Sequence, residues 1–276
     1  MKIKRTLVSI GVFFAAQLLV SLIFMIAGMI QGMGIMEAMT ATMGPALLIS
    51  DFLVIVILLL LKYCSIRELF KKVPADVLFI SIVFAMSGMY AVELVSSQFE
   101  IPNTLEEQFQ AMAGTLTGFL GIGIVGPIME EMIMRRVILK EMAKATKSMW
   151  WGIIISSALF AIIHINPIQI VFAMPAGIFL GWIYCKTGSL LVPICIHIIN
   201  NTISFVLMSV GTEGEGEFSL NSTLGVILLI SFTLICVVSC IWINRYYAKI
   251  KKEQELQKAA AVEESQSDSG AGELVQ

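Results

Sequence analysis

Long apolar runs, each about the length of a membrane span, constrain the fold of this chain more than any other feature. Hydrophobic residues make up 58% of the 276 residues and charged residues only 14%, a composition that excludes an ordinary soluble domain. A helix needs roughly 20 apolar residues to cross the hydrocarbon core of a bilayer. The sequence therefore predicts an all-α fold, a polytopic transmembrane helical bundle of about eight spans. The runs lie at about 7–30, 43–62, 76–96, 116–140, 150–166, 168–185, 188–210 and 222–244.

The distribution of charge predicts how this bundle is oriented. With eight spans, all 18 Lys and Arg residues fall on one side of the membrane, whereas the loops on the other side, beginning with the one that holds Glu37, carry only acidic charges. Because positively charged loops stay in the cytoplasm, both termini are predicted to be cytoplasmic. The outer loops 97–115 and 211–219 are either a gate for substrate or ordinary solvated loops. No basic face or motif suggests a nucleic-acid partner.

Charged residues interrupt the apolar sequence at one point within the predicted span 116–140. Glu130 and Glu131 are adjacent there, and Arg135 follows four residues after Glu131. A charged side chain at membrane depth costs about 2.5 to 3.5 kcal/mol on insertion scales, so such charges indicate a functional site or a paired bundle interior. Residues four apart share a helix face, which predicts an ion pair between Glu131 and Arg135. Glu130 points about 100° away and is free to act as a base. In the alternative interpretation, these charges only anchor neighbouring helices or mark the cytoplasmic border.

The chain has only two histidines, and both lie in predicted spans. Phe160 precedes His164 by four residues, so the two rings are predicted to share a helix face, and Asn166-Pro167 is predicted to end or kink that helix. Asn201 follows His197 by four residues. Both of these side chains can donate hydrogen bonds to one point, as an oxyanion site requires. The alternative is that the same side chains form interhelical hydrogen bonds that only pack the bundle.

These polar residues are predicted to lie at one depth, roughly 16 to 21 Å from the cytoplasmic border at 1.5 Å per residue. Glu130 and His164 would hold a water that attacks a peptide carbonyl, and His197 with Asn201 would stabilise the oxyanion. A zinc-bound water held by Glu130, His164 and His197 is the alternative, because two imidazoles and one carboxylate leave an open fourth position. The sequence lacks the compact His-Glu-x-x-His zinc-protease motif. We therefore favour a site without a cofactor, with zinc as the second option.

At these residues the chain resembles the CPBP intramembrane protease family, which includes the CAAX prenyl endopeptidases and the bacterial Abi proteins. Three family motifs occur in order within about residues 115–205. They are Glu-Glu-x-x-x-Arg at Glu130, Glu131 and Arg135, Phe-x-x-x-His at Phe160 and His164, and His-x-x-x-Asn at His197 and Asn201.

The resemblance implies a membrane endopeptidase in which Glu130, His164, His197 and Asn201 are catalytic, with Glu131, Arg135 and Phe160 supporting the site. The family is commonly labelled a metalloprotease, although a glutamate mechanism without metal is also argued for it. Its members act on prenylated proteins, on peptides or on membrane proteins, so the implied partners are the lipid bilayer and such a substrate. The implied location is the plasma membrane of a bacterium, and the oligomeric state is left open.

The chain then divides into four parts. Residues 1–115 form N-terminal transmembrane helices, 116–210 the CPBP-like catalytic core, 211–248 the last transmembrane helix and 249–276 a disordered polar tail, because almost no apolar periodicity follows residue 252.

Two other functions remain open at this stage. One is a non-catalytic membrane scaffold or bacteriocin self-immunity protein. The other is an ion or proton pathway that uses Asp51, a carboxylate within the second span. Asp51 could instead simply cap or hydrogen-bond a neighbouring helix.

Overall fold

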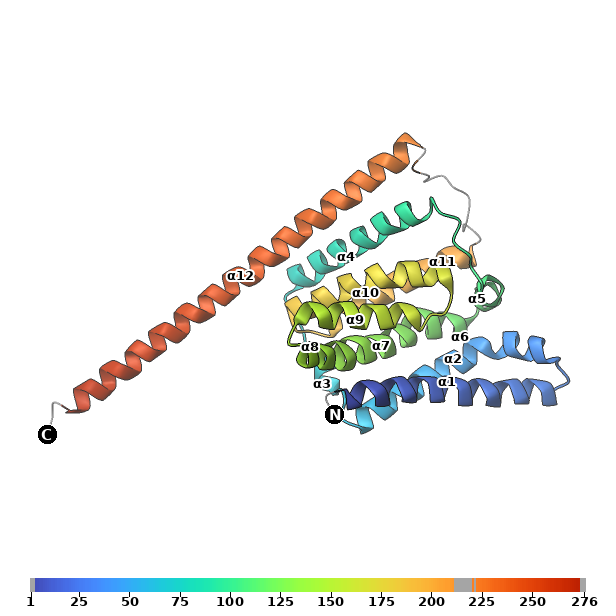
Figure 1. Cartoon of the computed structure of the whole chain (residues 1–276), viewed down its shortest axis with the longest axis horizontal. Helices are drawn as coiled ribbons and strands as arrows, with labels where there is room; N and C mark the ends of the chain where they lie inside the picture. Colours follow the sequence, from blue (N-terminus) through green and yellow to red (C-terminus); the bar gives the residue numbers. More distant parts are fainter. Residues whose placement is uncertain (1–2, 211–219, 221, 274–276) are drawn as a thin grey trace.

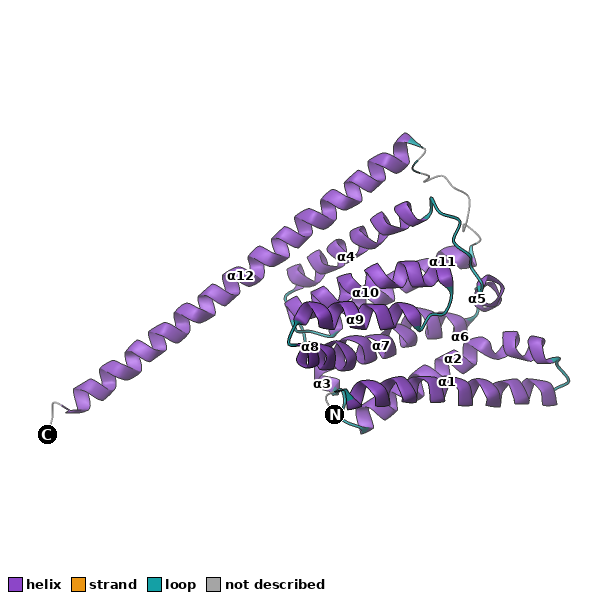
Figure 2. Ribbon diagram, in the orientation of Figure 1, coloured by secondary structure: helices purple, strands orange, loops and turns teal. Residues whose placement is uncertain are grey.

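The computed structural model describes residues 3–210, 220 and 222–273 and contains only helices among them (Figures 1 and 2). This confirms the predicted all-α membrane bundle. The elements are α1 (Lys4–Ile30), α2 (Ile35–Leu60), α3 (Ile66–Leu69), α4 (Ala75–Ser96), α5 (Glu106–Met112), α6 (Leu116–Gly118), η1 (Phe119–Val125), α7 (Gly126–Glu131), η2 (Met132–Leu139), α8 (Lys140–Thr146), α9 (Met149–Ile162), α10 (Pro167–Thr187), α11 (Leu191–Ser209) and α12 (Thr223–Glu273).

Within the described residues, seven helical segments are long and apolar enough to cross a membrane. Six are single helices, and the seventh joins α6, η1, α7, η2 and α8 into one run, Leu116–Thr146. The remaining predicted span, 150–166, corresponds to helix α9, which has only 14 residues. At 1.5 Å per residue it is about 21 Å long. It ends at Ile162 because the chain turns before Pro167, with Ile165 at a φ of 61°. The protein is therefore an integral multi-pass membrane protein.

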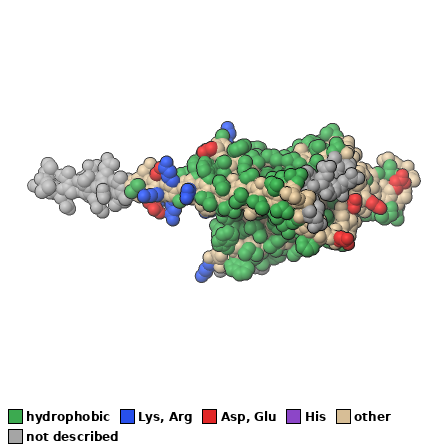
Figure 3. All heavy atoms as spheres, turned by 90° about the horizontal axis from the view of Figure 1, so that it is seen from above, with side chains coloured by type: hydrophobic (Ala, Val, Ile, Leu, Met, Phe, Trp, Pro, Cys, Tyr) green, Lys and Arg blue, Asp and Glu red, His purple; other side chains and the backbone are tan. Residues whose placement is uncertain are grey.

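Contacts between residues far apart in the sequence define two ends of the bundle. At one, which we call the basic end, Glu141 accepts hydrogen bonds from the start of α1, and the Ser189 hydroxyl donates to the Lys71 carbonyl. At the other, the acidic end, Asn166 bonds to Asn103. Figure 1 shows α1 starting and α12 finishing on the left, at the basic end. In Figure 3 the visible Lys and Arg side chains also lie toward the left, and hydrophobic side chains cover the middle. The cytoplasmic position of the basic end stays a prediction.

Helix α2 begins earlier than the predicted span 43–62. Glu37, expected in an outer loop, lies in its first turn, where its carboxylate accepts a hydrogen bond from the Gly34 N–H at 3.4 Å. An acidic side chain is favourable at this position because the unpaired N–H groups of the helix start carry partial positive charge.

The last helix continues beyond its apolar segment. Residues 249–273, predicted to be a disordered tail, extend α12 as far as Glu273. Ala, Lys, Gln and Glu are common in the first part of this segment, after residue 249, and they are strong helix formers. In addition, Lys249 pairs with Glu253 one turn later at 3.9 Å. The outer loop predicted at 211–219 lies outside the described residues.

The main core surrounds the middle of the chain and not its ends. Met132, Ile133 and Ile138 of η2 are almost fully buried, whereas Leu18 of α1 is 71% exposed and Val238 of α12 is 63% exposed. Apolar side chains as exposed as these suit a lipid environment. Helices α9 and α10 pack closely, since a Cβ at Gly177 would lie 2.8 Å from the Ser157 Cβ. The run Leu116–Thr146 therefore carries its charged residues into the centre of the bundle.

Candidate active site

The backbone that carries the two glutamates is not a uniform α-helix. The short α7 lies between the π-helical segments η1 and η2, with Glu130 and Glu131 at its C-terminal end. A π-helix forms i→i+5 hydrogen bonds, and π-helical turns are frequent at functional sites. These segments change the angular spacing of side chains before and after Glu130, which the sequence pattern did not predict.

Glu131 and Arg135 form the predicted ion pair. Arg135 Nε lies 3.0 Å from Glu131 Oε2, and neither side chain is exposed. The guanidinium also lies over the Phe160 ring, 5.0 Å from its centroid. Among the described residues, its nitrogens have no well-directed hydrogen-bond partner. The contact is therefore ionic, and the pair depends on mutual charge compensation in a dry interior.

His197, on α11, lies between the two adjacent carboxylates. Its Nδ1 donates a hydrogen bond to Glu131 Oε1 at 2.9 Å, and its Nε2 lies 3.5 Å from Glu130 Oε2. The second distance exceeds the usual N–H···O range, so this contact does not fix Glu130 tightly. The Glu130 side chain is also 19% exposed, whereas that of Glu131 is completely buried. Glu130 and Glu131 are adjacent in the sequence, yet Glu130 is partly exposed and Glu131 is buried.

Phe160 brings the two histidines to the same place. Its ring packs edge-on against His164, with centroids 4.9 Å apart, and against His197 at 5.6 Å. His164 lies in the turn beyond α9 and not within the helix as predicted, but it still reaches back to bond the Phe160 carbonyl through Nδ1 at 2.7 Å. A carbonyl only accepts, so Nδ1 carries a proton, and in the neutral ring Nε2 is then an acceptor.

Asn201 is held by contacts from two sides. Its Nδ2 donates to the Ile122 carbonyl of η1 at 3.0 Å, and its Oδ1 accepts from Asn200 at 3.3 Å. One of its two N–H groups is therefore used for packing α11 against η1, and the other is available. In the described part of the chain, Asn201 and His197 share a helix but form no hydrogen bond with each other.

Asp51, on α2, lies behind the glutamates. It is 5% exposed and accepts a hydrogen bond from Gln17 of α1 at 2.7 Å. This is the neighbouring-helix bond that the sequence offered as an alternative to a proton pathway. The Asp51 carboxylate is close enough to Glu130 for their charges to interact. No pattern in the sequence indicates Gln17 as its partner.

The structure does not bring all of the predicted residues together. Among the described residues, no hydrogen bond or ion pair joins His164 to Glu130. Nor does any set of three His, Cys, Asp or Glu side chains in this part of the chain have an arrangement that fits a metal ion. At His197, for example, both ring nitrogens face glutamates, Nδ1 facing Glu131 and Nε2 facing Glu130. In the described part of the chain, the residues proposed for zinc do not fit the ion as they stand.

Comparisons with known proteins find similarity in the middle of the chain. Residues 112–203, which contain the three motifs, match the family of type II CAAX prenyl endopeptidase Rce1-like proteins. The chain is also 26% identical over 208 residues to a Bacillus subtilis (strain 168) protein named "Putative membrane peptidase YdiL", an alignment that covers 70% of this chain and 83% of that relative. No solved structure matches the chain significantly. The predicted resemblance to the CPBP proteases is confirmed.

Proposed function

Because residues 112–203 match the Rce1-like endopeptidases, we propose that this protein is an intramembrane endopeptidase of the plasma membrane of a bacterium. Its substrates are peptides or proteins held in the membrane, prenylated or not. Both comparisons support a protease, and the many exposed apolar side chains of the bundle suit a substrate that approaches from the lipid.

The position of His197 between Glu130 and Glu131 is the observation that carries this proposal. Glu131 is buried and engaged by both His197 and Arg135, so it holds the imidazole in place and is not free to react. Glu130 is partly exposed and only loosely held. A carboxylate in that condition is suited to take a proton from water.

In the proposed reaction, the oxygen of a water attacks the scissile carbonyl carbon while Glu130 takes one of its protons. His164 accepts a hydrogen bond from the same water through its unprotonated Nε2. The developing oxyanion accepts hydrogen bonds from the free N–H of Asn201 and from the Nε2–H of protonated His197, whose Nδ1–H stays with Glu131. The carbon–nitrogen bond then breaks, and Glu130 returns its proton to the leaving amine.

The decisive experiment measures cleavage of a peptide library by the purified protein in detergent. The library pairs each prenylated peptide with its unprenylated form. We expect Glu130→Gln to lower kcat/KM by roughly 10² to 10⁴, the range for loss of a general base. The matched control is Glu100→Gln, which removes an exposed carboxylate at the acidic end and should leave cleavage unchanged.

A parallel sample with a strong chelator tests the zinc alternative. Full activity with chelator supports the glutamate mechanism, whereas loss that added zinc restores would replace it with a metal mechanism. Cleavage by Glu130→Gln at the wild-type rate would refute Glu130 as the base. If neither protein cleaves any peptide and Glu130→Gln keeps the cellular phenotype, the scaffold or self-immunity function replaces the protease.

A further inference from the structure

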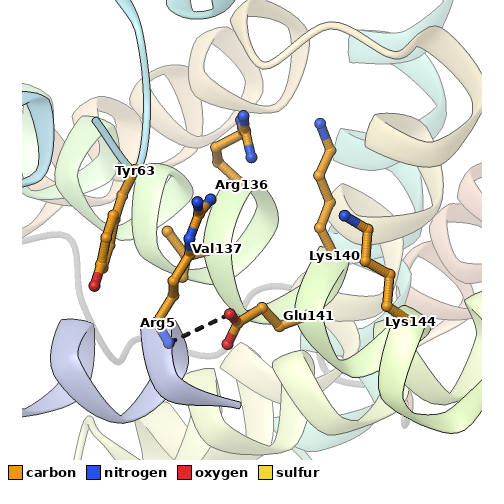
Figure 4. A pocket seen from close by; sticks show the side chains of 7 residues that line it. All are labelled: Arg5, Tyr63, Arg136, Val137, Lys140, Glu141 and Lys144. Carbon is orange, nitrogen blue, oxygen red and sulfur yellow. Dashed lines mark hydrogen bonds between the residues drawn. The ribbon is translucent and has the colours of Figure 1, made fainter. Parts of the chain in front are cut away.

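A cavity of about 260 Å³ opens at the basic end, and none of its lining residues belongs to the three sequence motifs. It lies between the start of α1, the segment after α2 and the junction of η2 with α8. Its lining is mostly cationic and is shown in Figure 4. The lining residues are Arg5, Tyr63, Arg136, Val137, Lys140, Glu141 and Lys144.

Glu141, the one acid in this lining, is already occupied. Its carboxylate accepts hydrogen bonds from the Thr6 backbone N–H and hydroxyl, both at 2.8 Å, and from the Arg5 backbone N–H at 3.3 Å. It therefore satisfies the N–H groups at the start of α1. Figure 4 shows this carboxylate below the four cationic side-chain ends, bonded to the Arg5 backbone.

The four cations lack enough partners of their own. Arg136 pairs with Glu68 at 2.7 Å, but in the described part of the chain the side chains of Arg5, Lys140 and Lys144 form no ion pair. Arg5 lies over the Tyr63 ring, 5.3 Å from its centroid. Four cations face two carboxylates, Glu68 and Glu141, so the cavity carries an uncompensated positive charge of about two. An anion would relieve this repulsion.

Two exposed tryptophans indicate that the cavity lies near the level of lipid headgroups. Helix α9 begins just after α8, and its first residues include Trp150, 58% exposed, and Trp151, 56% exposed. Exposed tryptophans gather where the membrane meets water. Basic pockets between transmembrane helices bind anionic lipid headgroups, and the planar fork of an arginine suits phosphate oxygens.

We propose that this cavity is a binding site for the phosphate group of an anionic phospholipid, with Arg5, Arg136, Lys140 and Lys144 as its cationic contacts. The site binds one headgroup between α1 and the run Leu116–Thr146. Because Arg136 directly follows Arg135, the bound lipid stabilises the same π-helical segment, η2, that carries the buried partner of Glu131.

The test uses the full chain, freed of lipid in a neutral detergent and titrated with phosphatidylglycerol, with phosphatidylcholine or with inorganic phosphate. Native mass spectrometry counts bound lipid, and the thermal midpoint reports stabilisation. We expect one phosphatidylglycerol to bind more tightly than phosphatidylcholine, and the double variant Lys140→Gln/Lys144→Gln to bind it roughly 30-fold more weakly. The matched double variant Lys249→Gln/Lys251→Gln removes the same charge from exposed positions on α12 and should change affinity by less than about twofold.

Equal loss in both double variants would overturn the site, because it would indicate general attraction between the charged protein and the lipid. Equal binding of phosphatidylcholine and phosphatidylglycerol would overturn it as well. Inorganic phosphate that stabilises the protein as well as phosphatidylglycerol does would assign the cavity to a soluble anion and refute the lipid. If the Lys140→Gln/Lys144→Gln protein does not fold, Arg5→Gln tests the cavity from α1, and wild-type affinity in that variant would contradict the proposal.

Discussion

His197 and Glu131 are 66 residues apart in the sequence, yet the His197 Nδ1 lies 2.9 Å from the Glu131 Oε1. The contact joins α11 to the end of α7 in a buried position. The other oxygen of the same carboxylate faces Arg135. Glu131 is therefore the junction through which a buried cation and an imidazole are fixed relative to each other, and Glu130, its neighbour, stays partly exposed.

Glu131→Gln tests this junction as a positioning residue. The amide keeps an oxygen that accepts from His197, but it replaces a charged hydrogen-bond acceptor by a neutral one. We expect kcat to fall by about tenfold to a hundredfold, with KM nearly unchanged. This loss is at or slightly below the loss that follows removal of one hydrogen-bond donor to an oxyanion. Steady-state kinetics on the cleaved peptide measures both constants. A change confined to KM would contradict the role.

Arg135→Ala removes the partner of a buried carboxylate. Breaking a buried ion pair from one side typically costs about 3 to 5 kcal/mol because the remaining charge is uncompensated. We therefore expect a large fall in the midpoint of thermal or denaturant unfolding in detergent. The double variant Arg135→Ala/Glu131→Gln should be more stable than Arg135→Ala alone, since no uncompensated charge remains. Wild-type stability in Arg135→Ala would show that the pair contributes nothing.

Phe160→Leu keeps an apolar side chain but removes the ring that contacts Arg135, His164 and His197. We expect a loss of stability of about 1 kcal/mol, as for a similar-sized apolar replacement with lost ring contacts. Cleavage should fall more steeply, by roughly a hundredfold, because small displacements of reacting groups cost that much. Leu159→Ala, one residue away, is the control. It should lower stability while cleavage per folded molecule stays the same.

The architecture was predictable because a membrane allows few backbone solutions. Apolar runs of span length must become helices that satisfy their own N–H and C=O groups, so most spans were located correctly. The helix α9 is shorter than its predicted span, because composition does not reveal that the chain turns after Ile162. The helical continuation of α12 was also missed, because the absence of an apolar stripe does not prevent exposed Lys, Glu and Gln residues from forming a helix.

At the site, the contacts within one helix turn were predictable and those across the bundle were not. The pair between Glu131 and Arg135 follows directly from their spacing. The bond from His197 to Glu131 depends on how α11 packs against α7, and no pattern in the sequence encodes that distance. The π-helical segments on either side of Glu130 also alter side-chain directions from the assumed 100° per residue.

Glu68 and Arg136 allow a prediction about pH. Partial burial disfavours the Glu68 charge, but hydrogen bonds from Arg136 and from Ser65 outweigh it and lower the pKa of the carboxyl below its ordinary value. A lowered folded-state pKa means that the stabilising effect is complete above the unfolded pKa of about 4.3 and is lost as the pH falls through the folded pKa. We expect Glu68→Gln to be less stable than wild type at pH 7.

The Glu68 side chain is 37% exposed, so solvent limits the effect to about 0.2 to 1 kcal/mol. Unfolding midpoints at pH 7 and near pH 3 measure it, and the difference between wild type and Glu68→Gln should be smaller at the lower pH. Glu253→Gln breaks the exposed pair with Lys249 on α12 and should be neutral at both values. A difference for Glu68→Gln that persists undiminished at low pH would mean that packing, and not the charge of Glu68, stabilises this part of the basic end.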